Sequence, residues 1–321
     1  MKTLTERQQE LIQLLSDGNF HSGEQIGVHL GISRAAISQQ MKSLRQLGLE
    51  VFSITGKGYR LTNPIQLMDE SVIQSGASEA PVHIHQVISS TNQVMMSDLD
   101  HWAKGECLLA ETQTAGRGRR GRQWHSPFGS QYIMSMYWRI DQGPAAAMGL
   151  SLAIGVAVVK ALESMGYQEL GLKWPNDVYL KNRKLAGILV EMAAAVGGVC
   201  HLVIGTGINL QLPEELIQKM DQPCAHLAEQ GIAVDKNVFC IQMINTLREH
   251  LSAFETNGLS AFLNDWNRLD IFIDKPVKVI QGEQIIKGIY RGIDEQGNML
   301  LQLDDGSMKR FVGGEVSLRA D

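Results

Sequence analysis

Residues 116–124 have the sequence GRGRRGRQW, in which four arginines are interleaved with three glycines. No packed helix or strand needs this composition, whereas glycine, which lacks a Cβ atom, lets a backbone fold closely around a ligand. Arginine supplies a planar set of donors that binds a phosphate or a carboxylate through two parallel hydrogen bonds. Trp124 adds a ring on which an adenine could stack. The stretch therefore predicts a loop that binds an anionic, nucleotide-like ligand.

A disordered nucleic-acid-binding segment rich in arginine and glycine is the alternative for this loop. Such segments lie within long low-complexity regions. Here the loop is short and lies between two runs with the composition of strands, Glu106–Gln113 and Tyr132–Trp138. In the second run, strand alternation places four large side chains on one face, namely Tyr132, Met134, Met136 and Trp138. We therefore expect a structured loop between two strands.

A second polar cluster lies beyond a long apolar helix that is predicted over residues 145–165. Residues 173–177, KWPND, place a cation, an indole, an amide and a carboxylate around a proline that interrupts a strand. The strand predicted next, Lys184–Glu191, begins with a lysine, which at a strand end usually serves solubility. A further strand, Val203–Asn209, has glycines and a terminal asparagine that could lie against a ligand. These segments predict a site for a nucleotide and a carboxylate in a mixed α/β domain.

The start of the chain predicts a winged helix-turn-helix. Apolar residues at helical spacing define a first helix, which ends at the turn formed by residues 17–19. Ser22 followed by Gln25 is the capping-box pattern that opens a second helix. Gly31 suits a turn with positive φ, and Ser33 is a favourable N-cap for a third helix that ends near residue 47.

The side chains of the third helix favour DNA binding over the alternative of a plain helical hairpin. That helix carries basic residues and no acidic one, and its polar side chains can hydrogen-bond base edges. After it, Val51–Ile54 and Tyr59–Leu61 predict a hairpin whose tip presents a lysine to a phosphate. The residues predicted to contact DNA are Ser33, Arg34, Ser38, Gln39, Lys42, Arg45 and Lys57.

Length and composition limit the remaining possibilities. A chain of 321 residues is long enough for two or three domains, and its net charge of −5 means that any DNA binding is local. The four cysteines are scattered, which argues against a zinc site or a disulfide framework and fits a reducing cytosol. Residues 1–9 lack the apolar core of a signal peptide. The most apolar stretch, residues 145–159, is shorter than the roughly 20 residues that span a bilayer. We therefore expect a cytoplasmic protein that has no membrane partner.

The last fifty residues predict a small SH3-like barrel. Short alternating strands are separated by turn sequences, and they cover Pro276–Gln281, Ile285–Gly292, Met299–Leu303, Met308–Phe311 and Val316–Arg319. We predict an α+β multidomain protein with a winged helix-turn-helix over residues 1–64, a mixed α/β ligand-binding domain over residues 65–270 and the barrel over residues 271–321.

Four segments resemble those of the biotin–protein ligases in order and spacing. They are Ser90-Thr91-Asn92, the arginine- and glycine-rich loop with Trp124, residues 173–177, and residues 184–189. With a winged helix in front, the chain resembles the bifunctional members that also repress a biotin operon. The resemblance implies that ATP and biotin form biotinyl-5'-AMP, which passes biotin to a lysine of the biotin carboxyl carrier protein. It also implies that the adenylate acts as corepressor for operator DNA, and that the adenylate-bound protein is a homodimer.

The resemblance also implies roles for individual residues. Biotin would be bound by Ser90, Thr91, Asn92, Gln113, Arg117, Gly118, Arg119 and Lys184. ATP or the adenylate would be bound by Arg119, Arg120, Arg122, Trp124, Asn176, Asp177 and Asn209. Lys184, Arg117 and Arg119 would be catalytic, and Asp177 would hold Mg²⁺. Two alternatives stay open: a ligand-responsive transcription factor that has lost catalysis, and a lipoate ligase, which shares the catalytic fold.

Overall fold

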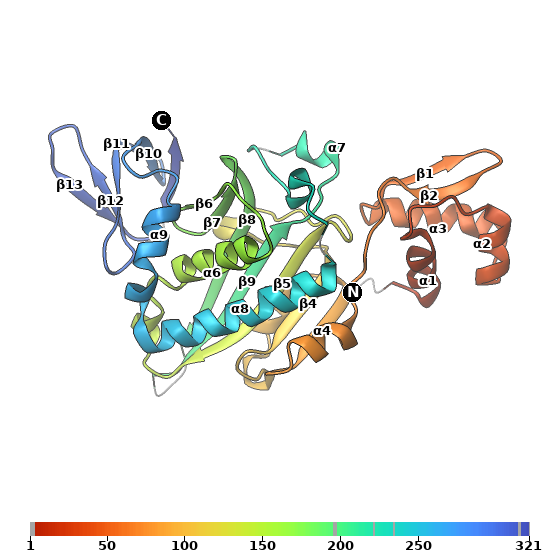
Figure 1. Ribbon diagram of the computed structural model, residues 1–321, viewed down its shortest axis with the longest axis horizontal. Coiled ribbons are helices and arrows are strands. Elements are labelled where there is room, and N and C mark those ends of the chain that lie inside the picture. The colour runs from red at the N-terminus through yellow and green to blue at the C-terminus, as the bar shows by residue number, and fades with distance from the viewer. Residues whose placement is uncertain (1–3, 195–197, 221, 234, 314–315, 321) are drawn as a thin grey trace.

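The structure, a computed structural model, describes residues 4–194, 198–220, 222–233, 235–313 and 316–320. Figure 1 shows three parts: a winged helix at one end, a central sheet covered by helices, and a C-terminal sheet at the other end. The predicted α+β multidomain class with an N-terminal helix-turn-helix and a central mixed α/β domain is thereby confirmed.

The N-terminal part contains α1 (Glu6–Leu15), α2 (Gly23–Leu30), α3 (Arg34–Gln46), β1 (Val51–Ile54) and β2 (Gly58–Leu61). Ser22 and Gln25 form the predicted capping box of α2, and the Ser33 hydroxyl accepts the backbone N–H of Ala36 at the start of α3. Gly31 has a φ of 62° in the turn between them. A Cβ atom on Gly27 would lie 3.0 Å from the Ile32 carbonyl oxygen, so the close approach of this turn to α2 favours glycine. The predicted helix-turn-helix and wing are confirmed.

The central sheet has the strand order β3-β4-β5-β9-β8-β7-β6, in which β3 and β4 are parallel and the other pairs antiparallel. Its strands are β3 (Val82–Ile88), β4 (Cys107–Gln113), β5 (Gln131–Ile140), β6 (Leu170–Lys173), β7 (Asp177–Leu180), β8 (Arg183–Ala194) and β9 (Cys200–Asn209). The helices after the wing are α4 (Glu70–Gly76), α5 (Thr91–Met96), α6 (Leu150–Ser164), α7 (Glu214–Ile217), α8 (Lys236–Asn257) and α9 (Leu263–Leu269). Short 3₁₀ turns are η1 (Leu99–His101), η2 (Arg119–Gly121), η3 (Pro144–Ala147), η4 (Leu227–Gln230) and η5 (Leu259–Phe262).

The helices α6 and α8 cover one face of this sheet, as Figure 1 shows. The predicted face of β5 packs there, because Tyr132, Met134, Met136 and Trp138 all belong to the same buried cluster. On the other face, Met95 of α5 packs with side chains of β3, β4, β5 and β9. A helix pressed against each face of the sheet fixes the strand ends that carry the polar segments.

The long apolar helix differs from its prediction at its start. It begins as η3 and continues as α6 from Leu150, because Gly149 between them has a φ of 79°. A Cβ atom on Gly149 would lie 2.6 Å from the Leu259 side chain. The segment Pro144–Ser164 is long and apolar enough to cross a membrane, but 61% of its most apolar window is buried inside the fold. It serves as the core helix of the central domain, as predicted.

The C-terminal part is an antiparallel sheet with the order β13-β12-β11-β10-β14. Its strands are β10 (Pro276–Gln281), β11 (Gln284–Ile293), β12 (Met299–Gln302), β13 (Met308–Phe311) and β14 (Val316–Ala320). Among the described residues the edge strands β13 and β14 do not pair, so the sheet is open where the sequence predicts a closed barrel. Its core is continuous with the central domain, since Val277, Tyr290 and Met299 belong to the same buried cluster as α6.

Phe128 joins the winged helix to the central domain. It follows the arginine- and glycine-rich loop closely, yet it is 1% exposed and packs in the hydrophobic cluster of α1, α2 and α3. Its backbone N–H donates to the Leu47 carbonyl over 3.3 Å, just after the end of α3. Met68, in the linker after the wing, is bound by the central domain, because its N–H donates to the buried Glu111 carboxylate of β4 over 2.6 Å. The two parts therefore share packed contacts.

Phe128→Ala is expected to lower the free energy of unfolding by about 3–5 kcal/mol, the usual cost of truncating a buried phenylalanine. Thermal or urea denaturation of the full chain measures it. Phe52→Ala is the matched control, since Phe52 is 48% exposed on the wing, and it should cost less than about 1 kcal/mol. Equal effects of the two substitutions would contradict the claim that Phe128 stabilises the contact between the winged helix and the central domain.

Candidate active site

A cavity of about 170 Å³ lies over the end of the central sheet where β8 and β9 meet the arginine- and glycine-rich loop. Every residue that the sequence predicts for biotin or nucleotide binding lines it. These residues come from the start of α5, β4, the loop, the turn after β6, β7, β8 and β9. The structure therefore brings all of these candidates together around one pocket.

The Ser90-Thr91-Asn92 segment forms one polar wall of the pocket. Ser90 is the N-cap of α5, so the segment is held by a helix start. The backbone N–H and the hydroxyl of Thr91 both donate to the Gln113 side-chain carbonyl, over 2.8 and 3.2 Å. The Asn92 amide donates to Glu191 over 2.9 Å and to the Leu189 carbonyl over 3.2 Å. All three residues are buried, and buried amides and hydroxyls fixed in this way present a defined pattern to a polar ligand.

The loop 116–124, which we call the flap, is a short hairpin. The N–H of Trp124 donates to the Gly116 carbonyl over 2.9 Å, and that of Gly118 donates to the Arg122 carbonyl over 2.7 Å. Arg117 lies 3.7 Å from Glu191, on the same side as the Ser90–Asn92 wall. Arg120 and Arg122 are exposed at the rim of the pocket. The alternative of a disordered segment does not fit this ordered hairpin.

Arg119 is the flap arginine that reaches furthest into the protein. Its guanidinium donates to the Asn176 side-chain carbonyl over 2.8 Å and to the backbone carbonyl of Gly313. Burial lowers the pKa of Arg119, because desolvation disfavours the charged form, while the nearby Asp177 carboxylate opposes that shift. An arginine held here keeps its charge and links the flap to the turn after β6 and to the C-terminal part.

Lys184 lies at the other side of the pocket floor. Its ammonium group is 2.8 Å from the Asp177 carboxylate, and both side chains are largely buried. Lys184 on β8 is opposite Tyr179 on β7, and Asp177 lies two residues before Tyr179, on the same face of that strand. Lys184 Nζ also lies 5.8 Å from the centre of the Trp124 ring. A lysine and a carboxylate on neighbouring strands can hold an anion and a cation side by side.

The Trp124 ring lies on two glycines of the sheet. A Cβ atom on Gly207 would lie 2.7 Å from two ring carbons, and one on Gly187 would lie 3.2 Å from a third. The glycines of β9 line the pocket and also give room to protein side chains, since Gly205 lies against Asn92 as Gly207 lies against Trp124. The side chains that fill the space above these glycines depend on tertiary packing, which the sequence alone does not specify.

Gln131 and Glu191 are among the polar residues of the site that were not predicted. Gln131 is 1% exposed and bonds to Trp124 and Asn209, and Glu191 bonds to Asn92. The sequence did contain a signal for both residues, because each lies in a largely apolar strand. A glutamine or glutamate that is buried in a strand needs hydrogen-bond partners inside the protein. Asn209 bonds to Gln131 and to the Ala225 carbonyl, so both ends of its amide are engaged by the protein.

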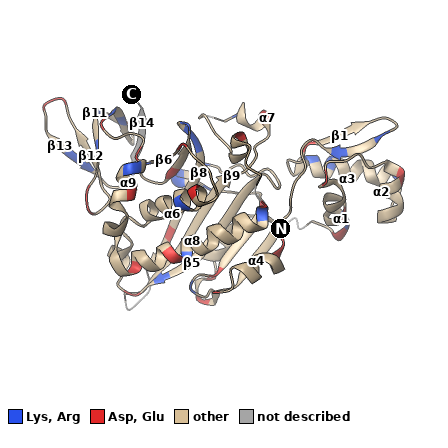
Figure 2. Cartoon of the chain, in the orientation of Figure 1, with Lys and Arg blue, Asp and Glu red and all other residues tan. Residues whose placement is uncertain are grey.

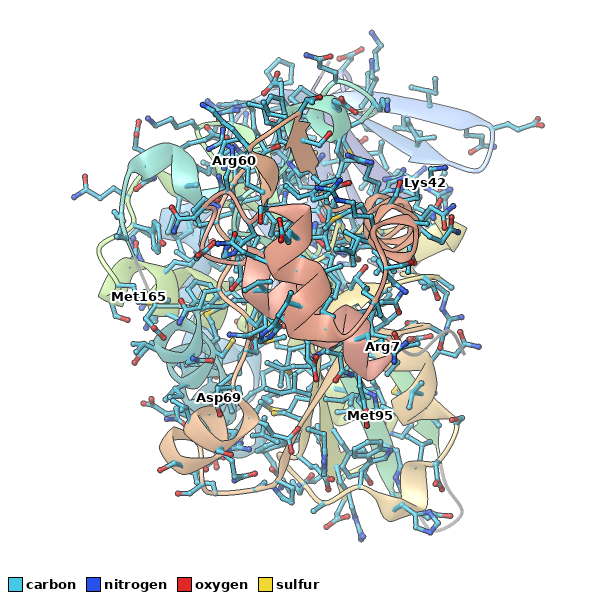
Figure 3. The ribbon with its side chains drawn as sticks, turned by 90° about the vertical axis from the view of Figure 1, so that its right-hand side faces the viewer. Arg7, Lys42, Arg60, Asp69, Met95 and Met165 are labelled. Carbon is cyan, nitrogen blue, oxygen red and sulfur yellow. The ribbon has the colours of Figure 1, made fainter. Side chains whose placement is uncertain are left out.

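The predicted DNA-contacting residues lie on α3 and the wing. Arg34, Ser38 and Lys42 are exposed and four residues apart, so they share one face of α3. Arg45 instead donates to the Val51 carbonyl over 2.9 Å and ties α3 to β1. Ser33, Gln39 and Lys57 are also exposed. Figure 2 shows basic residues on α3 and the wing, and Figure 3 looks onto this end of the molecule and labels Lys42.

Comparisons with known proteins agree with this geometry. The chain is 49% identical over 310 residues to the bifunctional ligase/repressor BirA of Salmonella typhimurium, covering 97% of each chain. The chain belongs to the biotin protein ligases. This ligase is also 47% identical over 311 residues to BirA of Escherichia coli, again covering 97% of each chain.

Family profiles divide the ligase as the fold does. The biotin/lipoate A/B protein ligase family matches residues 84–209, the biotin protein ligase C-terminal domain matches residues 272–319, and an HTH domain matches residues 7–60. Among solved structures, the biotin protein ligase from Aquifex aeolicus in complex with biotin and ATP is similar, with a TM-score of 0.63 and 28% identity. That likeness covers 75% of this ligase and 99% of the other chain.

Proposed function

We propose that this biotin protein ligase joins biotin to AMP, transfers it to a lysine of a biotin carboxyl carrier protein, and represses biotin synthesis genes. The observation that carries the proposal is the pocket, in which flap arginines and the Lys184–Asp177 pair surround one cavity. The winged helix on the same chain and the similarity to bifunctional ligase/repressors along nearly all of its length support the second activity.

In the first step, a carboxylate oxygen of biotin attacks the α-phosphorus of ATP, the bond to the β-phosphate breaks and pyrophosphate leaves. Both reactants are anions, so the protein lowers the barrier by positioning them and by neutralising charge. Lys184 would contact the biotin carboxylate and the α-phosphate, and Arg117 and Arg119 would bind the same anions from the flap. These three residues are the catalytic set that we propose.

The remaining residues would bind the rest of the two substrates. The buried hydrogen-bonding wall of Ser90, Thr91, Asn92 and Gln113 is suited to the polar head group of biotin, and Gly118 would leave room for biotin beside the flap. Trp124 would cover the adenine. Around the nucleotide would lie Arg119, Arg120, Arg122, Asn176, Asp177 and Asn209.

We propose that Asp177 helps to hold Mg²⁺. The described residues contain no cluster of three metal-binding side chains. Mg²⁺ typically binds through one or two carboxylates together with substrate phosphates, so a single pocket carboxylate fits an ion that the nucleotide brings. When bound, the ion would neutralise phosphate charge. Lys184 would hold the Asp177 carboxylate in position, since the two groups are 2.8 Å apart.

In the second step, the neutral amine of the carrier lysine attacks the acyl carbon of the adenylate. The carbon–oxygen bond to the phosphate breaks, AMP leaves and the nitrogen loses its proton. The mixed anhydride reacts with water, so the flap must cover it until the carrier arrives. Arg119 supports this role, because it ties the flap to Asn176 and Gly313.

Incubation with ATP, Mg²⁺, biotin and a carrier domain, followed by mass spectrometry of the carrier, tests the proposal. One added biotinyl group on the carrier is the expected result. A transcription factor without catalysis would release no pyrophosphate in the presence of biotin. A lipoate ligase would use lipoate in preference when the two acids compete in the same assay.

We propose that adenylate binding orders residues 142–144 and the flap, and so builds a homodimer. Two recognition helices would then face two operator half-sites, as in other dimeric helix-turn-helix proteins. The segment is suited to a conformational change, because Gly143 has a φ of 84° in a connection between β5 and η3. Sedimentation with ATP and biotin should show twice the monomer mass, whereas a mass unchanged by these ligands would exclude the dimer.

Lys42→Ala is expected to weaken binding to a promoter fragment of the biotin synthesis genes and to reduce the slope of log affinity against log salt by about 1. Lys42 would contact a phosphate from the exposed face of α3, so the loss should be similar for related sequences. Arg7→Ala on α1 is the control and should leave the slope unchanged. An unchanged slope in the Lys42 variant would remove this residue from the DNA interface.

We also propose the division into residues 1–64, 65–270 and 271–321, an SH3-like curl of the C-terminal sheet, and a cytoplasmic location. The hydrophobic cluster of the winged helix, to which the central domain contributes only Val87 and Phe128 among its buried residues, supports the first boundary. The register shift between Tyr290 and Ile293 of β11 supports a curled sheet, because a bulge bends the strand that contains it. The four cysteines are free, which fits a reducing compartment.

A further inference from the structure

The indole of Trp124 is the start of a buried chain of hydrogen bonds. Its N–H donates to the Gln131 carbonyl oxygen over 3.1 Å, and the Gln131 amide nitrogen donates to the Asn209 carbonyl oxygen over 2.8 Å. The Asn209 amide nitrogen then donates to the Ala225 carbonyl over 2.9 Å. Ala225 in turn donates its own N–H to the Lys184 carbonyl over 2.8 Å. The chain therefore runs from the flap to the strand that carries the catalytic lysine.

Each amide in this chain has only one suitable orientation. An indole N–H can only donate and a backbone carbonyl can only accept. The first condition turns the oxygen of Gln131 toward Trp124, and the second turns the nitrogen of Asn209 toward Ala225. Because Gln131 and Asn209 are opposite each other in the β5–β9 register, their remaining oxygen and nitrogen face one another. Both residues are buried, at 1% and 3% exposure, so water does not compete for these bonds.

The sheet beneath the indole leaves it little freedom of position. The ring fits against Gly207, where any Cβ atom would lie 2.7 Å from its carbons. Packing fixes the plane of the ring, and the bond to Gln131 fixes its rotation within that plane. Trp124 is the last residue of the flap hairpin, since its own N–H closes the hairpin onto Gly116. The base of the flap is therefore anchored at the indole, while its arginine-bearing tip extends from this anchor.

We propose that Gln131 is a positioning residue that anchors the flap through Trp124 and so retains the adenylate in the pocket. The inference rests on the proposed function and adds to it a residue to which no role in the reaction was assigned. Without the hydrogen bond to Gln131, the indole of Trp124 can rotate where it packs on Gly207, and the flap then opens more often. Gln131 contributes through Trp124, so its effect requires the indole N–H.

A double-mutant cycle of Trp124→Phe and Gln131→Met tests this dependence. Radiolabelled ATP and biotin are supplied without carrier, and the rate at which adenylate leaves the enzyme is measured by rapid filtration. Trp124→Phe removes the N–H and changes the ring size, but the second effect is present in both backgrounds and cancels in the cycle. Gln93→Met, at an exposed position of α5, is the control for the chemical change and should release adenylate at the wild-type rate.

The expected coupling between the two substitutions is about fivefold, the usual net value of one hydrogen bond. Trp124→Phe should therefore raise the release rate about five times more in the wild type than in the Gln131→Met background. Effects that simply multiply would overturn the proposal. If Gln131→Met loses its cooperative melting transition, Gln131→Asn replaces it, because the shorter side chain cannot reach both partners. Adenylate formation by the unsubstituted enzyme tests the proposed function separately, so failure of the coupling leaves that function standing.

Discussion

Lys184→Ala is expected to slow the formation of biotinyl-adenylate by about 10²–10³-fold, the usual cost of removing one preorganised group that stabilises transition-state charge. The ammonium group lies in the pocket beside Asp177, where it would face both the biotin carboxylate and the α-phosphate. Its removal leaves two anionic reactants beside a carboxylate. Single-turnover measurement of pyrophosphate release, with and without biotin, gives the effect.

The fold should survive this substitution. The backbone bonds of Lys184, to the Pro223 carbonyl and from the Ala225 N–H, do not involve its side chain. Lys181→Ala is a matched control, because Lys181 is an exposed lysine just before β8 that pairs with Glu169 over 3.0 Å. It should form adenylate at the wild-type rate.

A further variant separates two roles of Lys184. If the lysine only neutralised Asp177, then Lys184→Ala would cause no further loss in an Asp177→Asn background, which by itself lacks the proposed Mg²⁺ ligand. If Lys184 acts on the substrates, the double variant is slower than Asp177→Asn alone. Lys184→Arg should recover part of the rate, since arginine retains the charge with a different geometry. Near-normal adenylate formation by Lys184→Ala would remove the residue from catalysis.

Local sequence signals were sufficient for the winged helix. The capping box at Ser22, the N-cap at Ser33 and the positive φ of Gly31 each depend on residues within four positions of one another, and the structure has all three. The anion-binding pocket could be predicted from the composition of residues 116–124, because arginines among glycines have few structural uses outside anion binding. The helix α8 was not predicted, although Phe239, Met243, Leu247 and Leu251 recur at helical spacing within it.

Contacts between distant segments could not be predicted in the same way. The bond between Gln131 and Asn209 joins positions 78 residues apart and exists only because β9 pairs with β5 in one register. The contact of Arg119 with Gly313 likewise depends on where the C-terminal sheet docks. Closure of that sheet into a barrel also depends on pairing between distant strands, which alternation within each strand does not determine.

Arg119→Gly is expected chiefly to let the adenylate escape, about 10–100 times faster, while adenylate still forms at a lower rate because one charge of the catalytic set is lost. The side chain makes charge-assisted bonds to Asn176 and to the Gly313 carbonyl, so its loss detaches the flap from two parts of the protein. One bond of this kind contributes about 1.5–3 kcal/mol, and about 1.4 kcal/mol corresponds to a factor of ten, so the expected effect corresponds to the net loss of about one such bond. Glycine also increases the backbone freedom of the flap.

The half-life of adenylate on the enzyme, measured by filtration after a chase with unlabelled substrates, gives this effect directly. Arg139→Gly is the control, because Arg139 is exposed on β5, pairs with Asp141 over 2.8 Å and lies outside the pocket. Arg119→Lys should fall between the two, since one ammonium group cannot hold both partners in the arginine geometry. Because Arg119 holds the tip of the flap and Trp124 its base, the Arg119→Gly effect should persist when the indole bond to Gln131 is intact. A wild-type half-life in Arg119→Gly would show that the flap is held closed by other contacts.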